Sequence, residues 1–316
     1  MTENQTQNSI DITAAIDELI TIRDLIRWAV TEFEKAGIYY GHGMGNALDE
    51  AVFIALSSLK LPLNIIESYF DSRLTRAERE MLLTLYQRRI TERTPAAYLT
   101  HEAWFAGLKF YVDEHVLVPR SPIAELIEKQ FEPWIEADKV ERILDLCTGS
   151  GCIGIASAYA FEWAEVDLAD ISPEAIEIAQ KNIDNHQLQE QVTVYQSDLF
   201  SALEGQKYDI IVTNPPYVDA IDMSILPDEF KQEPELGLAA GEDGLDLVKV
   251  ILKQAANHLN PEGILVVEVG NSQFALEELL PEVGFYWLEF ERGGQGVFLL
   301  TYEQLMEYQP LFLQMN

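Results

Sequence analysis

Cysteines, paired histidines and long apolar runs are all scarce in this sequence. Only Cys147 and Cys152 occur, and their spacing matches neither a CxxC redox pair nor a zinc knuckle, so we expect a reducing, cytoplasmic location. The five histidines form no HxH or HExxH pattern, which predicts no metal site. No apolar stretch approaches the roughly 20 residues that span a bilayer, and the start, MTENQTQNSID, lacks a secretory pattern. The sequence predicts a soluble protein without a membrane partner.

Positive charge is also scarce, with 21 basic against 53 acidic residues and a formal net charge of −32. Nucleic-acid binding draws its affinity from Lys and Arg that displace counterions, so this balance argues against a direct nucleic-acid partner. A basic protein would be attracted, although acidity that serves solubility alone is the alternative. With 48% hydrophobic residues among 316, the chain can form a core, and its length suits a catalytic domain plus a smaller one.

The first hundred residues predict a small helical domain over residues 1–100. Apolar residues recur at near-helical spacing over residues 10–36, and Gly37 follows as a stop. Further helical segments are expected over residues 51–59 and after Thr75. A helical domain of this size beside a catalytic domain is a candidate for substrate recognition.

A β-hairpin and a connecting helix are predicted over residues 101–138. The text WFAGLKFYVDEHVLV alternates apolar with polar residues around Asp113, which indicates two short strands with their turn there. Pro119 and Pro122 then open a helix over residues 123–130.

Strands and helices alternate over residues 139–316. Short apolar runs such as ILDLC, AEVDLAD and YDIIVT, separated by helical segments, indicate βαβ units and a parallel sheet covered on both faces. The final runs, GFYWLEFE and QGVFLLT, are joined only by Arg292-Gly293-Gly294, which is too short for a parallel crossover. The predicted fold class is α/β, with a mostly parallel, Rossmann-like sheet of seven strands and an antiparallel last strand.

A glycine-rich loop, DLCTGSGCIG over residues 145–154, follows the first of these strands. Its glycines let the backbone approach a ligand, and the next helix offers free N–H groups. Asp170 ends the second strand, where it can accept hydrogen bonds from two ribose hydroxyls. Together these features indicate an adenosine site rather than a merely structural turn. The spacing GxGxxG also fits a nicotinamide dinucleotide, so that cofactor stays open.

Two features favour S-adenosylmethionine as the cofactor. Asp145 can meet the ammonium of a methionyl tail, whereas it would repel a pyrophosphate. The antiparallel closing strand is typical of seven-stranded methyltransferases rather than of dehydrogenases. The Ser197–Phe200 turn can border the adenine, with Asp198 accepting from its exocyclic amine; a plain Asx turn is the alternative. The predicted cofactor-binding residues are Asp145, Cys147, Thr148, Gly149, Ser150, Gly151, Asp170, Ile171, Ser197, Asp198, Leu199 and Asn214.

The tetrapeptide Asn214-Pro215-Pro216-Tyr217 follows the fourth strand, at the carboxyl edge where open α/β sheets bind ligands. The Asn214 side-chain oxygen and a backbone carbonyl of the Asn-Pro stretch can each accept one N–H of a carboxamide and so aim its nitrogen at a methyl group. The prolines fix φ and remove N–H donors, and Tyr217 can lie against the planar amide. Positioning then carries most of the catalysis. Prolines that merely end a strand are the alternative.

The segments DLCTGSGCIG, SDLF and NPPY resemble the class I amino-methyltransferases, which include DNA adenine methyltransferases and protein glutamine methyltransferases. VLVPRSPIAELI and EPELGLAAGEDGL are similar to the glutamine methyltransferases that act on release factors and ribosomal proteins. The upstream text IYYGHGMGNALDEA, residues 38–51, most resembles the enzymes that modify large-subunit ribosomal protein three. This resemblance covers nearly the whole chain. It implies methyl transfer to a glutamine side chain, held by Asn214 and the Pro215 carbonyl beside Pro216 and Tyr217.

Two further candidates lie on the substrate side. Arg120 can orient a carbonyl or carboxylate at the mouth of the pocket, or can be a surface salt-bridge partner. Glu233 and Pro234, on the long loop after NPPY, can form a lid or a solvated acidic loop. Among whole functions, a release-factor glutamine methyltransferase, an adenine-amine nucleic-acid methyltransferase and a nicotinamide oxidoreductase stay open as alternatives to the ribosomal-protein enzyme.

Overall fold

The computed structural model describes residues 12–315, and the chain divides into two compact units. The helical unit holds the residues up to Glu102 together with Pro227–Gln232, and the sheet unit holds Ala103–Leu226 and Glu233–Asn316. The polar start of the chain and the first two residues of the helix predicted over 10–36 lie outside the described residues. The predicted domain boundaries at residues 100 and 138 stay predictions.

The helical unit begins with two helices in place of the single one predicted. Thr21 is extended and opens the second helix with a capping box: its Oγ1 accepts from Asp24 N at 3.1 Å, and Thr21 N donates to the Asp24 carboxylate at 2.9 Å. Gly37 ends this helix with a φ of 59°, so the predicted stop is confirmed. The helices of this unit are α1 (Thr13–Glu18), α2 (Ile22–Ala36), α3 (Ala47–Ser58), η1 (Glu67–Asp71), α4 (Arg76–Thr91), α5 (Ala96–Thr100) and η3 (Phe230–Gln232).

The core of the helical unit lies where α2, α3 and α4 pack together. Phe33 of α2 meets Tyr86 of α4 edge-on, with the ring centroids 5.7 Å apart. Arg89, also on α4, has no exposed side-chain surface. A buried guanidinium needs acidic partners, and the core supplies Glu50 from α3, itself buried.

A small hairpin opens the sheet unit. Its strands are β1 (Ala103–Phe105) and β2 (Leu108–Phe110), paired antiparallel. The predicted turn at Asp113 is wrong, because the chain reverses at Ala106 and Gly107, which have φ values of 48° and 74°. Two consecutive positive φ values match the twist of a two-residue hairpin, and glycine adopts them without strain.

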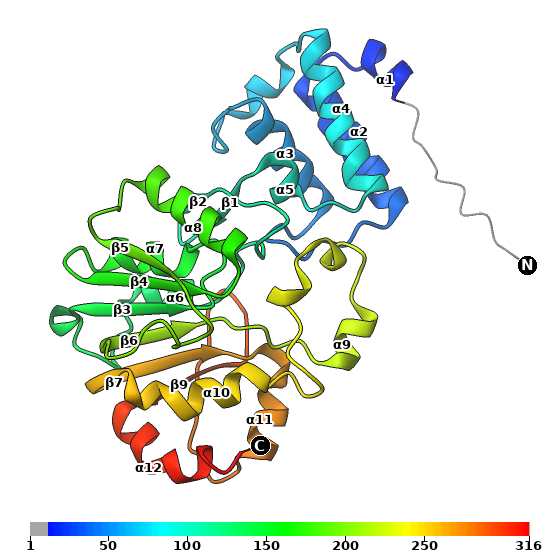
Figure 1. Ribbon diagram of the computed structural model, residues 1–316. Coiled ribbons are helices and arrows are strands. Elements are labelled where there is room, and N and C mark those ends of the chain that lie inside the picture. Colours follow the sequence, from blue (N-terminus) through cyan, green and yellow to red (C-terminus); the bar gives the residue numbers. More distant parts are fainter. Residues whose placement is uncertain (1–11, 316) are drawn as a thin grey trace, which may run out of the picture. The chain divides into compact units, whose positions relative to one another are not determined.

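The main sheet has seven strands within the described residues, in the order β5-β4-β3-β6-β7-β9-β8. Strands β3, β4, β5, β6 and β7 run parallel to one another, and β9 runs antiparallel to β7. Figure 1 shows these strands side by side. The predicted fold class, including the closing antiparallel strand, is confirmed. The strands are β3 (Arg142–Leu146), β4 (Glu165–Asp170), β5 (Val192–Gln196), β6 (Tyr208–Thr213), β7 (Leu259–Glu268), β8 (Tyr286–Trp287) and β9 (Val297–Thr301).

Helices cover both faces of this sheet. The helices of the sheet unit are α6 (Ala124–Glu128), α7 (Cys152–Ala160), α8 (Pro173–His186), α9 (Ala220–Ile225), α10 (Asp246–Gln254), α11 (Gln273–Leu279) and α12 (Tyr302–Phe312), with the short turns η2 (Ala137–Lys139), η4 (Glu235–Gly237), η5 (Ala255–Asn257) and η6 (Gly270–Ser272). Ile143 of β3 enters the core with α6, α7 and α8, whereas Leu144 enters the core with α10 and α12. None of the helices within residues 12–315 is long and apolar enough to cross a membrane.

Candidate active site

The carboxyl edge of the sheet brings the predicted segments together. Leu146 at the end of β3 pairs with Ala169 of β4 on one side and with Thr213 of β6 on the other. Thr213 Oγ1 donates to the Leu146 carbonyl at 2.6 Å. The glycine-rich loop, Asp170 and the NPPY tetrapeptide therefore leave three adjacent strands at one edge.

The glycine-rich loop allows α7 to start directly against β3 and β4. Gly151 precedes α7 with a φ of 81°. A Cβ on Gly154 would lie 2.0 Å from Leu168 Cδ2 and 3.0 Å from the Asp145 Cβ, so only glycine lets the helix approach this closely. The N-terminal end of α7 is thereby held at the edge of the sheet.

Asp145 lies within β3 and is completely buried. Its Oδ2 accepts from Thr148 Oγ1 at 2.6 Å and from Gly154 N at 2.8 Å. Its Oδ1 is buried and has no hydrogen-bond partner among the described residues. Burial raises the pKa of Asp145 to about 7. A carboxylate oxygen without a partner in such a place suits a cationic ligand group.

Asp170 is held in place by the backbone on both sides. Its Oδ2 accepts from Gly149 N at 2.9 Å, and its Oδ1 accepts from Ser172 N at 3.0 Å. Burial raises the pKa of Asp170. Each oxygen keeps a further lone pair, so the group can accept more hydrogen bonds from a ligand. Ile171, which follows it, is half-exposed.

The Ser197–Phe200 turn is held by Ser197 rather than by Asp198. Ser197 Oγ donates to the Leu199 carbonyl at 2.6 Å and accepts from Ala202 N at 3.0 Å. Asp198 is exposed, and its carboxylate bonds to no other described residue, so the predicted alternative of an Asx turn is wrong. Leu199 and Phe200 are buried in the core.

A pocket of about 500 Å³ borders this turn but lies away from the other predicted site residues. Asp198, Leu199 and Phe200 line it on one side, and residues of α10 and η5 line it on the other. Asp145, Asp170 and Asn214 do not line it, so the pocket reaches the predicted site only at the adenine-side turn.

Asn214 is half-buried, and its carboxamide has no hydrogen-bond partner within residues 12–315. The next residue, Pro215, is buried. Tyr217 is fixed from two directions: its hydroxyl donates to Glu268 Oε1 at 3.0 Å, and its carbonyl accepts from Ser272 Oγ at 2.8 Å. NPPY is therefore a rigid segment that presents an uncommitted amide.

Two residues at this edge were missed by the sequence analysis. Glu268 ends β7 in a buried position, where burial raises its pKa, and its Oε2 accepts from Ser121 Oγ at 2.5 Å. A charged residue at the end of the apolar run ILVVEV, placed like Asp170 at the end of β4, was the available signal. Ser121 gave no such signal, because it lies in a loop remote in sequence.

The two substrate-side candidates lie together. Arg120 donates to the Glu233 carboxylate through both terminal nitrogens, at 2.6 and 2.8 Å, and Val118 N donates to the same carboxylate at 2.9 Å. The Glu233 side chain is fully buried, and Pro234 directly precedes η4. Arg120 is thus an ion-pair partner, and the solvated-loop alternative for Glu233 is wrong.

Asp113, Glu114 and His115 are the group of possible metal ligands found within the described residues. Their ligand atoms lie within 4.8 Å of one another, and Glu114 and His115 are exposed. His115 Nδ1 lies 2.8 Å from Asp113 Oδ1, a contact that raises the pKa of His115. An exposed acidic group of this kind is common without an ion.

Comparison with known proteins identifies the family. Residues 129–231 match the family described as methyltransferase small domain. The ribosomal protein uL3 glutamine methyltransferase of Francisella tularensis is 48% identical over 94% of this chain and 95% of its own, and that of Neisseria meningitidis is 49% identical over 92% and 96%. A crystal structure of the hMettl16 catalytic domain with a MAT2A 3'UTR hairpin, 18% identical, shares the fold with a TM-score of 0.50 over 78% of this chain and 91% of its own. The chain belongs to the family of the ribosomal protein uL3 glutamine methyltransferases.

Proposed function

We propose that this protein transfers a methyl group from S-adenosylmethionine to the side-chain amide nitrogen of a glutamine in ribosomal protein uL3. The observation that carries the proposal is the free Asn214 carboxamide, held at the carboxyl edge beside a glycine-rich loop. The names of the two relatives support uL3 as the acceptor. We expect the reaction in the cytoplasm, where ribosomal proteins are made.

The residues around the glycine-rich loop fit S-adenosylmethionine. The unpartnered Asp145 Oδ1 would accept from the ammonium of its amino-acid tail, and Asp170 would accept from the ribose hydroxyls. Cys147 to Gly151 and Ile171 would border the nucleoside, and Ser197, Asp198 and Leu199 would border the adenine. When bound, this cofactor supplies an electrophilic methyl group attached to a sulfonium.

The task of the chain is to orient a weak nucleophile, because the lone pair of a carboxamide nitrogen is delocalised into its carbonyl. Asn214 Oδ1 and the Pro215 carbonyl would each accept one N–H of the acceptor amide, which fixes the nitrogen. Pro216 and the anchored Tyr217 keep this carbonyl in place. No strong base is needed, because the nitrogen becomes acidic once it carries the new methyl. Positioning therefore supplies most of the rate.

The remaining substrate-side residues, Arg120, Glu233 and Pro234, lie next to one another, and two of them form an ion pair. Arg120 and Glu233 neutralise each other, and with Pro234 they would border the path of the acceptor segment. The net charge of −32 favours a basic protein such as a ribosomal protein and disfavours a phosphate backbone.

The proposal is tested by incubating the protein with labelled S-adenosylmethionine and, separately, uL3, a mixture of the other ribosomal proteins, a release factor and DNA. We expect label in uL3 alone. Label in the release factor or in DNA, with uL3 unlabelled, would replace uL3 as the substrate. An Asn214→Ala preparation controls for a contaminating activity.

Cofactor affinity is expected to fall at acid pH. Because the pKa of Asp145 is raised to about 7, the carboxyl is protonated below that pH and no longer attracts an ammonium. The dissociation constant of S-adenosylhomocysteine should rise by up to about tenfold per pH unit below about pH 7. Calorimetry on the unaltered protein and on Asp145→Asn measures this, and the variant should bind weakly with a much flatter pH profile. If the dissociation constants of the two proteins depend on pH in the same way, Asp145 does not bind the ammonium.

A further inference from the structure

The loop that follows NPPY is anchored in the helical unit. The chain leaves the sheet unit at Leu226, contributes Pro227–Gln232 to the helical unit, and returns at Glu233. Within this segment Glu229 is buried, whereas Asp228 and Lys231 on either side of it are exposed and pair with each other at 2.8 Å. An isolated buried acid in an otherwise polar loop calls for specific partners.

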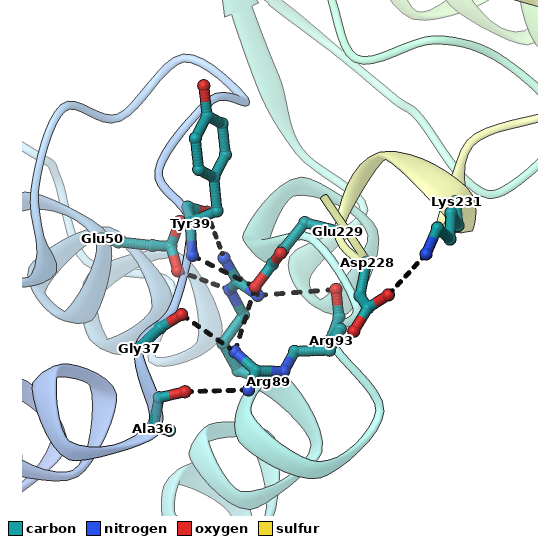
Figure 2. A network of polar contacts seen from close by, with 9 residues as sticks. All are labelled: Ala36, Gly37, Tyr39, Glu50, Arg89, Arg93, Asp228, Glu229 and Lys231. Atoms are coloured by element: carbon teal, nitrogen blue, oxygen red, sulfur yellow. Dashed lines mark hydrogen bonds and ion pairs between the residues drawn. The ribbon is translucent and has the colours of Figure 1, made fainter. Parts of the chain in front are cut away.

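Glu229 is the centre of a buried charge cluster (Figure 2). Its Oε1 accepts from Tyr39 N at 3.1 Å and from Arg93 Nη1 at 3.2 Å, and it lies 3.6 Å from Arg89 Nη1. Arg89 is paired on its other side with Glu50, at 2.5 Å. Two arginines and two glutamates thus balance one another inside the helical unit, and removal of one acid would leave a buried positive charge unmatched.

Arg93 connects the cluster to the end of α2. Its Nη2 donates to the Ala36 carbonyl at 2.8 Å, and its Nη1 donates to the Gly37 carbonyl at 3.4 Å. The helix end that Gly37 terminates therefore supplies acceptors for the same guanidinium that holds Glu229. The cluster therefore joins Glu229 to residues on α3, on α4 and just after α4, and to the end of α2, and these helices form the core of the unit.

The Phe230 ring packs against the segment over residues 38–51. None of the proposed cofactor and acceptor contacts involves this segment. The Phe230 ring centroid lies 4.4 Å from that of His42 and 5.7 Å from that of Tyr39. A Cβ on Gly41 would lie 2.6 Å from the Tyr39 ring and 2.8 Å from the Phe230 ring, so a side chain at this position would displace both rings. The segment YYGHG therefore makes two contacts with residues 227–232. Its Tyr39 and His42 rings pack against Phe230, and its Tyr39 backbone N–H donates to the Glu229 carboxylate.

We propose that Glu229 is a positioning residue for methyl transfer to the protein substrate, a role that rests on the proposed function. By fixing residues 227–232 to the helical unit, Glu229 divides the loop after NPPY into two shorter, ordered legs. The second leg is held again at Glu233 by Arg120. An acceptor segment then binds a loop that is already ordered. The conformational entropy lost on ordering the loop therefore does not reduce the binding free energy of the acceptor.

The test compares Glu229→Gln with the matched control Glu92→Gln, which removes a charge from the exposed Arg88–Glu92 pair at the end of α4. Glu229→Gln is expected to raise the KM for uL3 by about tenfold or more, with kcat and the affinity for S-adenosylhomocysteine little changed. Trypsin should cleave after the exposed Lys231 faster in this variant. Glu92→Gln should match the unaltered protein in all four measurements.

Phe230→Ala is the second variant, because it removes the ring contacts of Phe230 without leaving a buried charge. It should reproduce both the higher KM and the faster cleavage after Lys231. Two folded variants with unchanged KM would overturn the proposal, and so would cleavage that accelerates equally at Arg79 and Arg88 within α4, since Glu229 would then only stabilise the helical unit. If the unaltered protein fails to methylate uL3, the proposed function fails instead, while the Lys231 cleavage still reports on the anchor.

Discussion

Replacing Asn214 by alanine is expected to lower the turnover number for uL3 methylation by ~10²-fold or more, as when one preorganised hydrogen bond to a reacting group is lost. The side chain has no partner of its own in the described chain, so its removal breaks nothing structural. The affinity for S-adenosylhomocysteine should therefore stay within about threefold. Single-turnover kinetics with saturating cofactor, together with calorimetry, separate the two quantities.

Asn185→Ala is the matched control, because Asn185 is an exposed asparagine on α8 away from the carboxyl edge. It should leave turnover and cofactor affinity unchanged. An Asn214→Ala protein that loses cofactor binding as severely as turnover would contradict the role given to Asn214, because the residue would then serve the nucleoside and not the acceptor amide.

Replacing Asp170 by alanine should give the reverse pattern, with cofactor affinity lost first. The variant removes the acceptor proposed for two ribose hydroxyls and also releases Gly149 N and Ser172 N from their partner. Hydrogen bonds to a charged group contribute on the order of 2 kcal/mol each, so losing two of them should raise the dissociation constant of S-adenosylhomocysteine by roughly 10³-fold. At saturating cofactor, turnover should recover substantially.

Glu165→Ala controls for this experiment. Glu165 is an exposed acid at the opposite end of the same strand, β4. The Glu165→Ala variant should bind S-adenosylhomocysteine with the same affinity as the unaltered protein. If Asp170→Ala also binds normally, Asp170 does not contact the ribose.

The sheet and the conformation of the glycine-rich loop at its edge could be predicted because their signals are local. The apolar strands, the glycine spacing and the Asp170 position are each complete within a short stretch of sequence. Ser172 and Pro173 likewise begin α8, with Ser172 Oγ accepting from Ala175 N at 3.1 Å. The same loop left a nicotinamide cofactor open, and membership of the methyltransferase family removes that alternative.

The buried ion pairs and the buried hydrogen bond between Ser121 and Glu268 could not be predicted, because their partners are far apart in sequence. Arg120 and Glu233 are separated by 113 positions, Arg93 and Glu229 by 136, and Ser121 and Glu268 by 147. Each acid also stands among many others in a chain with 53 acidic residues, so sequence alone does not single it out. Only the fold shows which carboxylates are buried and matched.

Two local features were visible but misread. The Thr21 and Asp24 pair forms a capping box, which breaks the helix that apolar periodicity had extended from residue 10 to residue 36. The hairpin turn was assigned to Asp113 because aspartate favours turns, whereas Gly107 accommodates the positive φ that a two-residue turn requires. In both cases the position of the helix start or of the turn follows from the backbone conformation of one or two residues, which apolar periodicity does not report.

The most direct test of the central claim is fragmentation mass spectrometry of uL3 after incubation with the protein and S-adenosylmethionine. The account predicts a single added methyl on the side-chain nitrogen of one glutamine, absent when Asn214→Ala replaces the unaltered protein. A methyl group on a lysine or on the N-terminal amine of uL3 would contradict it, because those tetrahedral nitrogens do not present the planar pair of N–H donors for which Asn214 and the Pro215 carbonyl are placed.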